Sequence, residues 1–158
     1  MKWSLRKEHE FEPLPLVELT EDERHEFDGI LRTVTQGQGA GVLKLNKEHV
    51  DSFQRSILAK CLIGRAKRFV GLSLSHPSSA EDACRAAERA CAVCPLSIYF
   101  YDFACTLKQV GKVGEAKTVF REFLRRYETE SLDPVGEATL RARDLAGAAR
   151  HAREQTRE

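Results

Sequence analysis

The sequence lacks the long apolar run that a membrane-spanning helix requires. No stretch approaches the roughly 18 consecutive apolar residues needed to cross a bilayer, so we do not expect membrane insertion. The first residues, MKWSLRKEHEFEPLP, also lack the apolar core of a secretion signal. With no export signal, the odd number of cysteines, five, predicts reduced thiols and a cytoplasmic protein rather than a disulfide framework.

The chain also lacks an excess of charge of either sign. Its 25 basic and 24 acidic side chains give a net charge of +1, so whole-chain charge favours neither a nucleic acid nor a membrane surface as partner. The charge is nevertheless uneven. Residues 1–31 hold four basic and nine acidic side chains, whereas residues 32–75 hold eight basic and two acidic ones. Such an acidic head and basic middle can attract each other or a partner.

A glycine-rich stretch, TQGQGAGV, divides the chain but does not match a dinucleotide-binding loop. Gly37, Gly39 and Gly41 would need a further glycine at the position of Val42, and the preceding pattern is helical rather than that of a strand. We therefore interpret it as a flexible linker. The chain is thus divided into residues 1–45, an arm with a short helix and this linker, and a helical domain over residues 46–158.

Residues 1–19 are predicted to form an extended arm, because Pro13 and Pro15 disfavour helix at the residues before them. Too many apolar side chains lie here for a free tail: Trp3, Phe11, Leu14, Leu16, Val17 and Leu19. We expect the arm to dock on its own helices or on a partner or second copy, and we favour the latter. Thr20 and Glu23 then predict a capping box at the start of a short helix.

From Asn46 onward the apolar residues recur at helical spacing, which predicts an all-α protein. Gly64 either breaks the first of these helices or only weakens it. Near the end, Asp133 is a candidate N-cap and Pro134 fits a first helical position. One long C-terminal helix is predicted from a seam that repeats every three or four residues: Val135, Ala138, Ala142, Leu145, Ala149 and Ala152.

The segment from Ser97 to Glu130 resembles a tetratricopeptide repeat (TPR), a helix–turn–helix unit of about 34 residues. Gly111 takes the turn position, Glu115 and Ala116 match the acidic–small pair that opens the second helix, and Phe120 takes its aromatic position. The large and small positions of the first helix are taken by Phe100, Phe103, Ala104 and Leu107. Phe123 and Glu128 depart from the small and proline positions that the family shows later in the repeat.

A weaker copy covers about residues 64–96, with Lys67 at the aromatic position of its first helix. The resemblance implies an antiparallel helix–turn–helix array with a C-terminal capping helix. It also favours a tight corner over a nucleic-acid-binding loop for the sequence GKVG. A KH-type G-x-x-G loop would need an apolar residue where Lys117 stands, and flanking strands.

The cysteines and histidines are interpreted structurally. Cys91 and Cys94 form a C-x-x-C pair at the end of a predicted helix, where the helix dipole disfavours a reactive thiolate. We expect the cysteines to fill the core and the histidines to be solvated. A metal site is the less favoured alternative; it would draw on Cys84, Cys91, Cys94, Cys105 and His76.

The leading hypothesis is a non-catalytic adaptor or assembly subunit, without cofactor or metal, that binds another protein. In the TPR register, Arg65 and Arg68 from the weaker copy and Tyr101 and Lys108 from the better one would face a shared groove. The predicted partner-binding residues are Arg65, Arg68, Tyr101, Lys108, Trp3 and Phe11. The alternative hypothesis is a nucleic-acid-binding helical protein that uses the basic residues 60–68.

Overall fold

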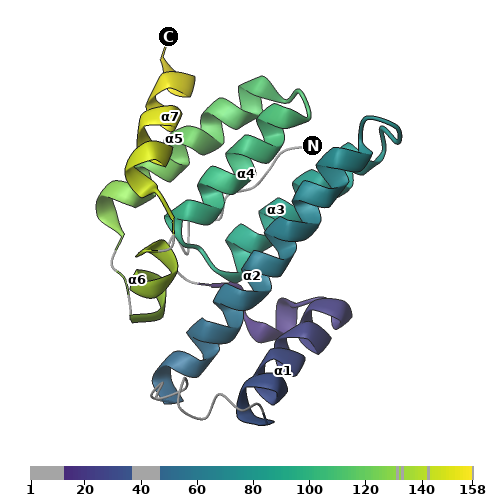
Figure 1. Ribbon diagram of the computed structural model, residues 1–158, viewed down its shortest axis with the longest axis vertical. Helices are drawn as coiled ribbons and strands as arrows, with labels where there is room; N and C mark the ends of the chain where they lie inside the picture. Colours follow the sequence, from purple (N-terminus) through teal and green to yellow (C-terminus); the bar gives the residue numbers. More distant parts are fainter. Residues whose placement is uncertain (1–12, 37–46, 131, 133, 142, 158) are drawn as a thin grey trace.

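The computed structural model describes residues 13–36, 47–130, 132, 134–141 and 143–157, and Figure 1 shows their arrangement. These residues form seven α-helices and one 3-10 turn, and no strand occurs among them, so the all-α prediction is confirmed. The turn covers Leu16–Glu18, and the helices are α1 (Glu21–Gln36), α2 (Lys47–Leu72), α3 (Ser79–Val93), α4 (Ser97–Gln109), α5 (Val113–Thr129), α6 (Pro134–Arg141) and α7 (Leu145–Thr156).

Most helices pack on the helix that follows them in the chain. The helix α2 packs along α3, α3 contacts α4, and α4 packs along α5 (Figure 1). The helix α7 lies against α5 and also touches α4, whereas the short helix α6 packs on α2. The remaining helix, α1, packs on α2 alongside its central part.

The long helix α2 continues unbroken through Gly64, which answers the question that the sequence left open. Gly64 is exposed, and a Cβ atom there would meet no other atom within 4 Å. The opposite side of the helix carries the packing: Leu58, Leu62 and Ala66 are buried in the core. Burial on that side outweighs the roughly 1 kcal/mol by which a glycine weakens a helix.

The core between α4 and α5 combines aromatic rings with alanines. Phe103, Phe120 and Phe123 have no exposed surface, and Ala104 and Ala116 are buried beside them. Small side chains let two helix backbones approach closely, while the large rings fill the space around the contact. The predicted burial of Ala116 is therefore confirmed.

The corner between α4 and α5 is a Schellman motif centred on Gly111. Gly111 has a φ of 90°, in the left-handed region that favours glycine. Its N–H donates to the Lys108 carbonyl at 3.0 Å, and the Lys112 N–H donates to the Leu107 carbonyl at 2.8 Å. These two bonds satisfy carbonyls that the end of a helix leaves unpaired. The sequence GKVG thus forms a tight helix–helix corner, as predicted.

The prediction of one long C-terminal helix is wrong, because the chain breaks between α6 and α7. Asp144 starts α7 by accepting a hydrogen bond of 2.9 Å from the Gly147 N–H. The preceding residue, Arg143, donates two hydrogen bonds to the buried carboxylate of Asp102 on α4, at 3.0 and 2.7 Å. Pro134 is the first residue of α6, as predicted, whereas Asp133 lies outside the described residues.

The predicted capping box at the start of α1 is confirmed. The Thr20 N–H donates to Glu23 Oε1 at 2.9 Å, and the Glu23 N–H donates to Thr20 Oγ1 at 3.1 Å. Just before it, Leu14 is buried, its N–H donates to the Ala92 carbonyl, and its own carbonyl accepts from Arg55. The described end of the arm therefore docks on the chain's own helices.

Candidate functional site

The position of α1 on α2 and α3 is fixed by polar contacts as well as by packing. Glu23, which is buried, accepts two hydrogen bonds from Arg89 of α3. The buried amide of Gln54 on α2 donates to the Phe27 carbonyl of α1 at 2.9 Å. Burial alone would raise the pKa of Glu23, but hydrogen bonds from Arg89 and Thr20 outweigh it and lower the pKa. The Glu23 carboxylate is therefore held charged where α1 meets Arg89 of α3.

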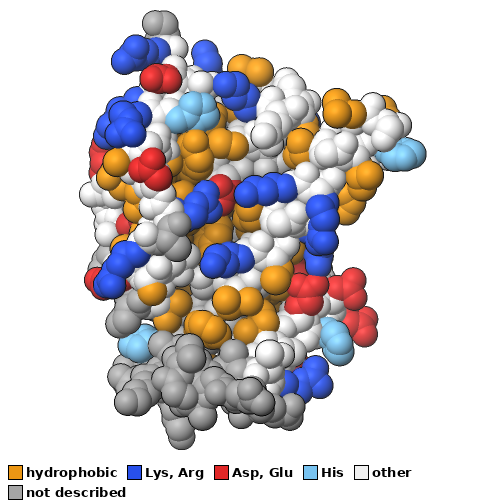
Figure 2. All heavy atoms as spheres, viewed as in Figure 1, with side chains coloured by type: hydrophobic (Ala, Val, Ile, Leu, Met, Phe, Trp, Pro, Cys, Tyr) orange, Lys and Arg blue, Asp and Glu red, His pale blue; other side chains and the backbone are white. Residues whose placement is uncertain are grey.

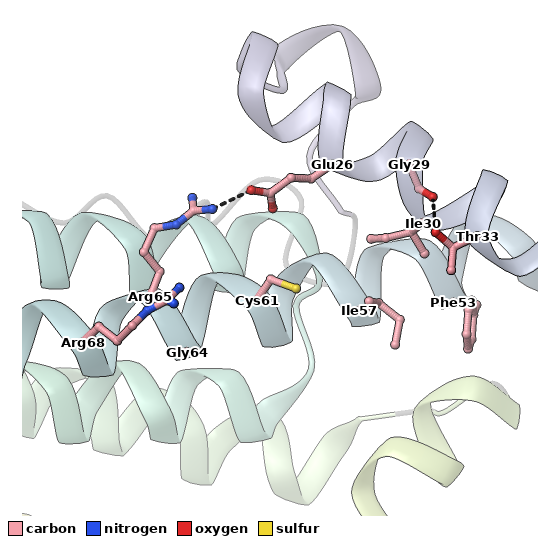
Figure 3. A pocket seen from close by; sticks show the side chains of 10 residues that line it. All are labelled: Glu26, Gly29, Ile30, Thr33, Phe53, Ile57, Cys61, Gly64, Arg65 and Arg68. Carbon is pink, nitrogen blue, oxygen red and sulfur yellow. Dashed lines mark hydrogen bonds and ion pairs between the residues drawn. The ribbon is translucent and has the colours of Figure 1, made fainter.

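A groove of about 820 Å³ opens between α1 and α2 (Figure 3). It runs along α2 from Phe53 to Arg68 and is closed on its other side by the middle of α1. The residues that line it are Glu26, Gly29, Ile30, Thr33, Phe53, Ile57, Cys61, Gly64, Arg65 and Arg68.

One part of the groove is apolar. Ile30 of α1 and Phe53 and Ile57 of α2 are each only half-buried, so each keeps apolar surface that packing among the described residues does not cover. Gly29 and Gly64 widen the groove because neither carries a side chain. The exposed thiol of Cys61 lies between the apolar part and the charged end (Figure 3).

The other end of the groove carries charge. Arg65 donates a hydrogen bond to Glu26 across the groove. The negative charge of the Glu26 carboxylate is therefore already paired. Arg68, one helical turn further along α2, is exposed and has no ion-pair partner among the residues that the structure describes. A ligand in this groove would therefore meet apolar side chains at one end and guanidinium groups at the other.

Of the four predicted partner-binding residues that the structure describes, it brings together two, Arg65 and Arg68, which both line the groove. Tyr101 is half-buried on α4, where its hydroxyl is joined to His151 Nδ1 by a hydrogen bond of 2.7 Å. Lys108 is exposed in the last turn of α4, away from the groove lining. Trp3 and Phe11 lie outside the described residues. The binding role of all six stays a prediction.

His151 does not match the expectation that the histidines are solvated. The ring of His151 on α7 is half-buried and makes edge contacts with Phe120 and Tyr101, with centroids 5.6 and 5.7 Å apart. It helps to attach α7 to α4 and α5. The polar neighbours of His151 in the sequence gave no sign of these rings, which come from other helices.

The cysteines of α3 fill the core, as predicted. Cys84 is fully buried, and Cys91 donates to the Tyr99 carbonyl at 3.2 Å. Burial raises the pKa of Cys84 to about 11 and that of Cys91 well above its usual range, so both thiols are held neutral. Within the described part of the chain, no group of three or more His, Cys, Asp or Glu residues is placed to hold a metal ion.

The apolar part of the groove was not identified as a site from the sequence. Ile30, Phe53 and Ile57 follow the same helical period as core residues, and periodicity does not show how much of each side chain remains exposed. That depends on how α1 lies across α2. A cluster of arginines one turn apart was the only sequence signal for this surface.

Comparison of the chain with protein-family models, with characterised proteins and with solved structures finds no match. In the described residues, no helix combines the length and apolar character needed to cross a membrane.

Proposed function

We propose that this chain is a non-catalytic adaptor or assembly subunit that binds a segment of another protein in the groove between α1 and α2. The observation that carries the proposal is the open apolar wall formed by Ile30, Phe53 and Ile57. Concave surfaces lined by apolar side chains with a few polar groups at one end are typical of binding sites. The arginines at the end would fix the orientation of the bound segment.

We further propose that α2 to α5 form two TPR-like units, with α7 as the capping helix. Three observations support this proposal: each pair of helices is joined by a short turn, α3 packs on α4 to link the pairs, and the α4–α5 corner has Gly111 and Ala116 at the family's turn and small positions. The helix α1 is an addition to such an array, and it creates the groove.

Binding of a nucleic acid is the second candidate function. Figure 2 shows Lys and Arg side chains over α2 and α4 on one face of the molecule. Lys60, Lys67 and Arg68 of α2 are exposed. Binding through phosphate contacts would weaken steeply as salt rises, whereas binding through an apolar groove would change little. A salt titration with a fluorescent single-stranded oligonucleotide therefore separates the two functions.

The proposed function is tested by quantitative co-purification from cells that make the protein. The full chain is compared with Ile57→Arg, which places a charge on the apolar wall, and with Val113→Arg, which adds the same charge at an exposed apolar residue of α5. We expect a protein partner with the wild type and with Val113→Arg, but not with Ile57→Arg. A partner retained equally by all three, or recovery of nucleic acid alone, would contradict the proposal.

A further inference from the structure

The dimensions of the groove match a helical ligand. Phe53 and Arg68 mark its two ends on α2 and lie about 22 Å apart at the usual rise of about 1.5 Å per residue. A ligand helix of about four turns has the same length. Its apolar residues, three or four apart, would form a stripe, and part of that stripe can pack between Ile30 on one wall and Phe53 and Ile57 on the other.

A helix also suits the hydrogen-bonding state of the groove better than an extended segment does. Both walls of the groove are α-helices, whose backbone N–H and carbonyl groups are already paired within the helices. An extended ligand would find few backbone partners on these walls, and its own buried amides would remain unpaired at a cost. A helical ligand satisfies its own backbone and presents only side chains.

The charges at the end of the groove determine the polarity of the ligand. Of the carboxylates on α1, only Glu26 lines the groove, and it is paired with Arg65. Arg68 thus leaves an excess of positive charge there, so a carboxylate on the ligand would be favoured and a lysine disfavoured. A nucleic acid fits less well, since it would place phosphates beside Ile30, Phe53 and Ile57 and would meet few cations.

We propose that the groove binds an amphipathic helix of a partner protein, about four turns long, whose apolar stripe packs on Ile30, Phe53 and Ile57 and whose acidic end lies beside Arg65 and Arg68. This inference rests on the proposed function and specifies the chemistry of the partner segment. It places the selectivity of the protein in the two arginines and its affinity in the apolar wall.

A selection from displayed 16-residue helical peptides tests the proposal with the full chain as target. The library varies the apolar stripe and the charges at both ends of the peptide, without any assumption about the natural partner. We expect enriched peptides with apolar residues at i, i+3 or i+4, and i+7, and with Asp or Glu at one end. Bound peptide should slow alkylation of the groove thiol Cys61 at least fivefold, while the half-buried Cys105 on α4 serves as internal control.

A charge-reversal variant tests whether the two arginines determine the charge preference of the selected peptides. With Arg65→Glu/Arg68→Glu as target, the acidic end should be replaced by Lys or Arg, and peptides selected on the wild type should bind at least tenfold more weakly. The matched control is Arg150→Glu/Arg153→Glu, which reverses two exposed arginines of α7 and should keep the wild-type preference. Circular dichroism confirms that each variant is folded.

Three results would overturn the inference. The first is enrichment of peptides that lack the helical stripe. The second is a charge preference that stays the same when Arg65 and Arg68 are changed to Glu. The third is slow alkylation of Cys61 that depends on protein concentration, which would indicate a second copy in the groove. If the co-purified partner is nevertheless lost with Ile57→Arg, the proposed function stands and only the helical, acidic chemistry fails. If no partner depends on the groove, the proposed function itself fails.

Discussion

Ala116 is the residue whose role depends most directly on close packing. It lies in α5 with only 1% of its surface exposed, beside fully buried aromatic rings. Ala116→Leu would force additional methyl groups into this contact and should lower the free energy of unfolding by about 1–3 kcal/mol. Denaturant unfolding measures the effect. Thr118→Leu, at an exposed position two residues further along, is the control and should be nearly neutral; an equally neutral Ala116→Leu would contradict the packing.

The ion pair between Asp102 and Arg143 is a second residue-scale feature. Asp102 is buried, and its carboxylate accepts two hydrogen bonds from Arg143. Arg143→Leu would leave the carboxylate buried without its partner and should destabilise the protein by about 1–3 kcal/mol. The double variant Asp102→Leu/Arg143→Leu should recover part of that loss, because no unpaired charge remains. A double variant as unstable as the single one would argue against this account.

These residues also show what the sequence could and could not predict. Gly111 and Ala116 were predicted because a turn glycine and a small residue after it form a local pattern. The contacts of Arg143 and His151 were not, since their partners lie 41 and 50 positions away in the chain and leave no local trace. The half-burial of Ile57 could not be predicted either, because it depends on a neighbouring helix.

At the scale of the element, α1 is held by charge as much as by apolar contact. The folded state lowers the pKa of Glu23 below its ordinary value of 4.5. Glu23 therefore stabilises the fold above pH 4.5, and this contribution is lost as the pH falls through the lower folded pKa. We expect hydrogen exchange in α1 to accelerate over that acidic range, and the free energy of unfolding to fall more in the wild type than in Glu23→Gln. The exposed Glu128→Gln variant should behave like the wild type; parallel pH profiles for all three would contradict this role.

The helix α7 is the element that covers α5. It buries Ala148, Ala149 and Ala152, and its His151 lies on Phe120. A chain that ends at Arg143 keeps the ion pair with Asp102 but exposes this surface, so it should unfold at a lower temperature and aggregate. A chain that ends at Thr156 should match the full chain. Light scattering during a thermal melt measures both, and a truncated chain that stays soluble and equally stable would show that α7 is not a cap.

The elements themselves were predictable where their signals are local. The capping box of Thr20 and Glu23 fixed the start of α1, and Pro134 fixed the start of α6. The break between α6 and α7 was missed because the alanine seam continues across it without a change of period. The predicted single helix is interrupted by the N-cap at Asp144 together with the hydrogen bonds from Arg143 to the distant Asp102. Periodicity predicts which faces are apolar, but tertiary contacts decide where a helix stops.

At the scale of the whole molecule, the packing of the helices leaves one surface open, the groove between α1 and α2. The acidic α1 lies against the basic α2, and this arrangement leaves a groove rather than a closed contact (Figures 2 and 3). The charge blocks in the sequence anticipated that these segments could attract each other. The groove could not be predicted, since its width depends on how α1 and α2 cross and on a glycine in each of these helices, Gly29 and Gly64.

Site-specific photo-crosslinking tests the central claim most directly. A photoreactive amino acid is placed at Cys61 in the groove or, as control, at the exposed Ser75 after α2, and the full chain is irradiated in cells that make it. We predict a covalent adduct with a discrete partner protein from position 61, much weaker or absent from position 75, and abolished by Ile57→Arg. No protein adduct from position 61, adducts of equal yield from both positions, or crosslinks to nucleic acid alone would contradict the account.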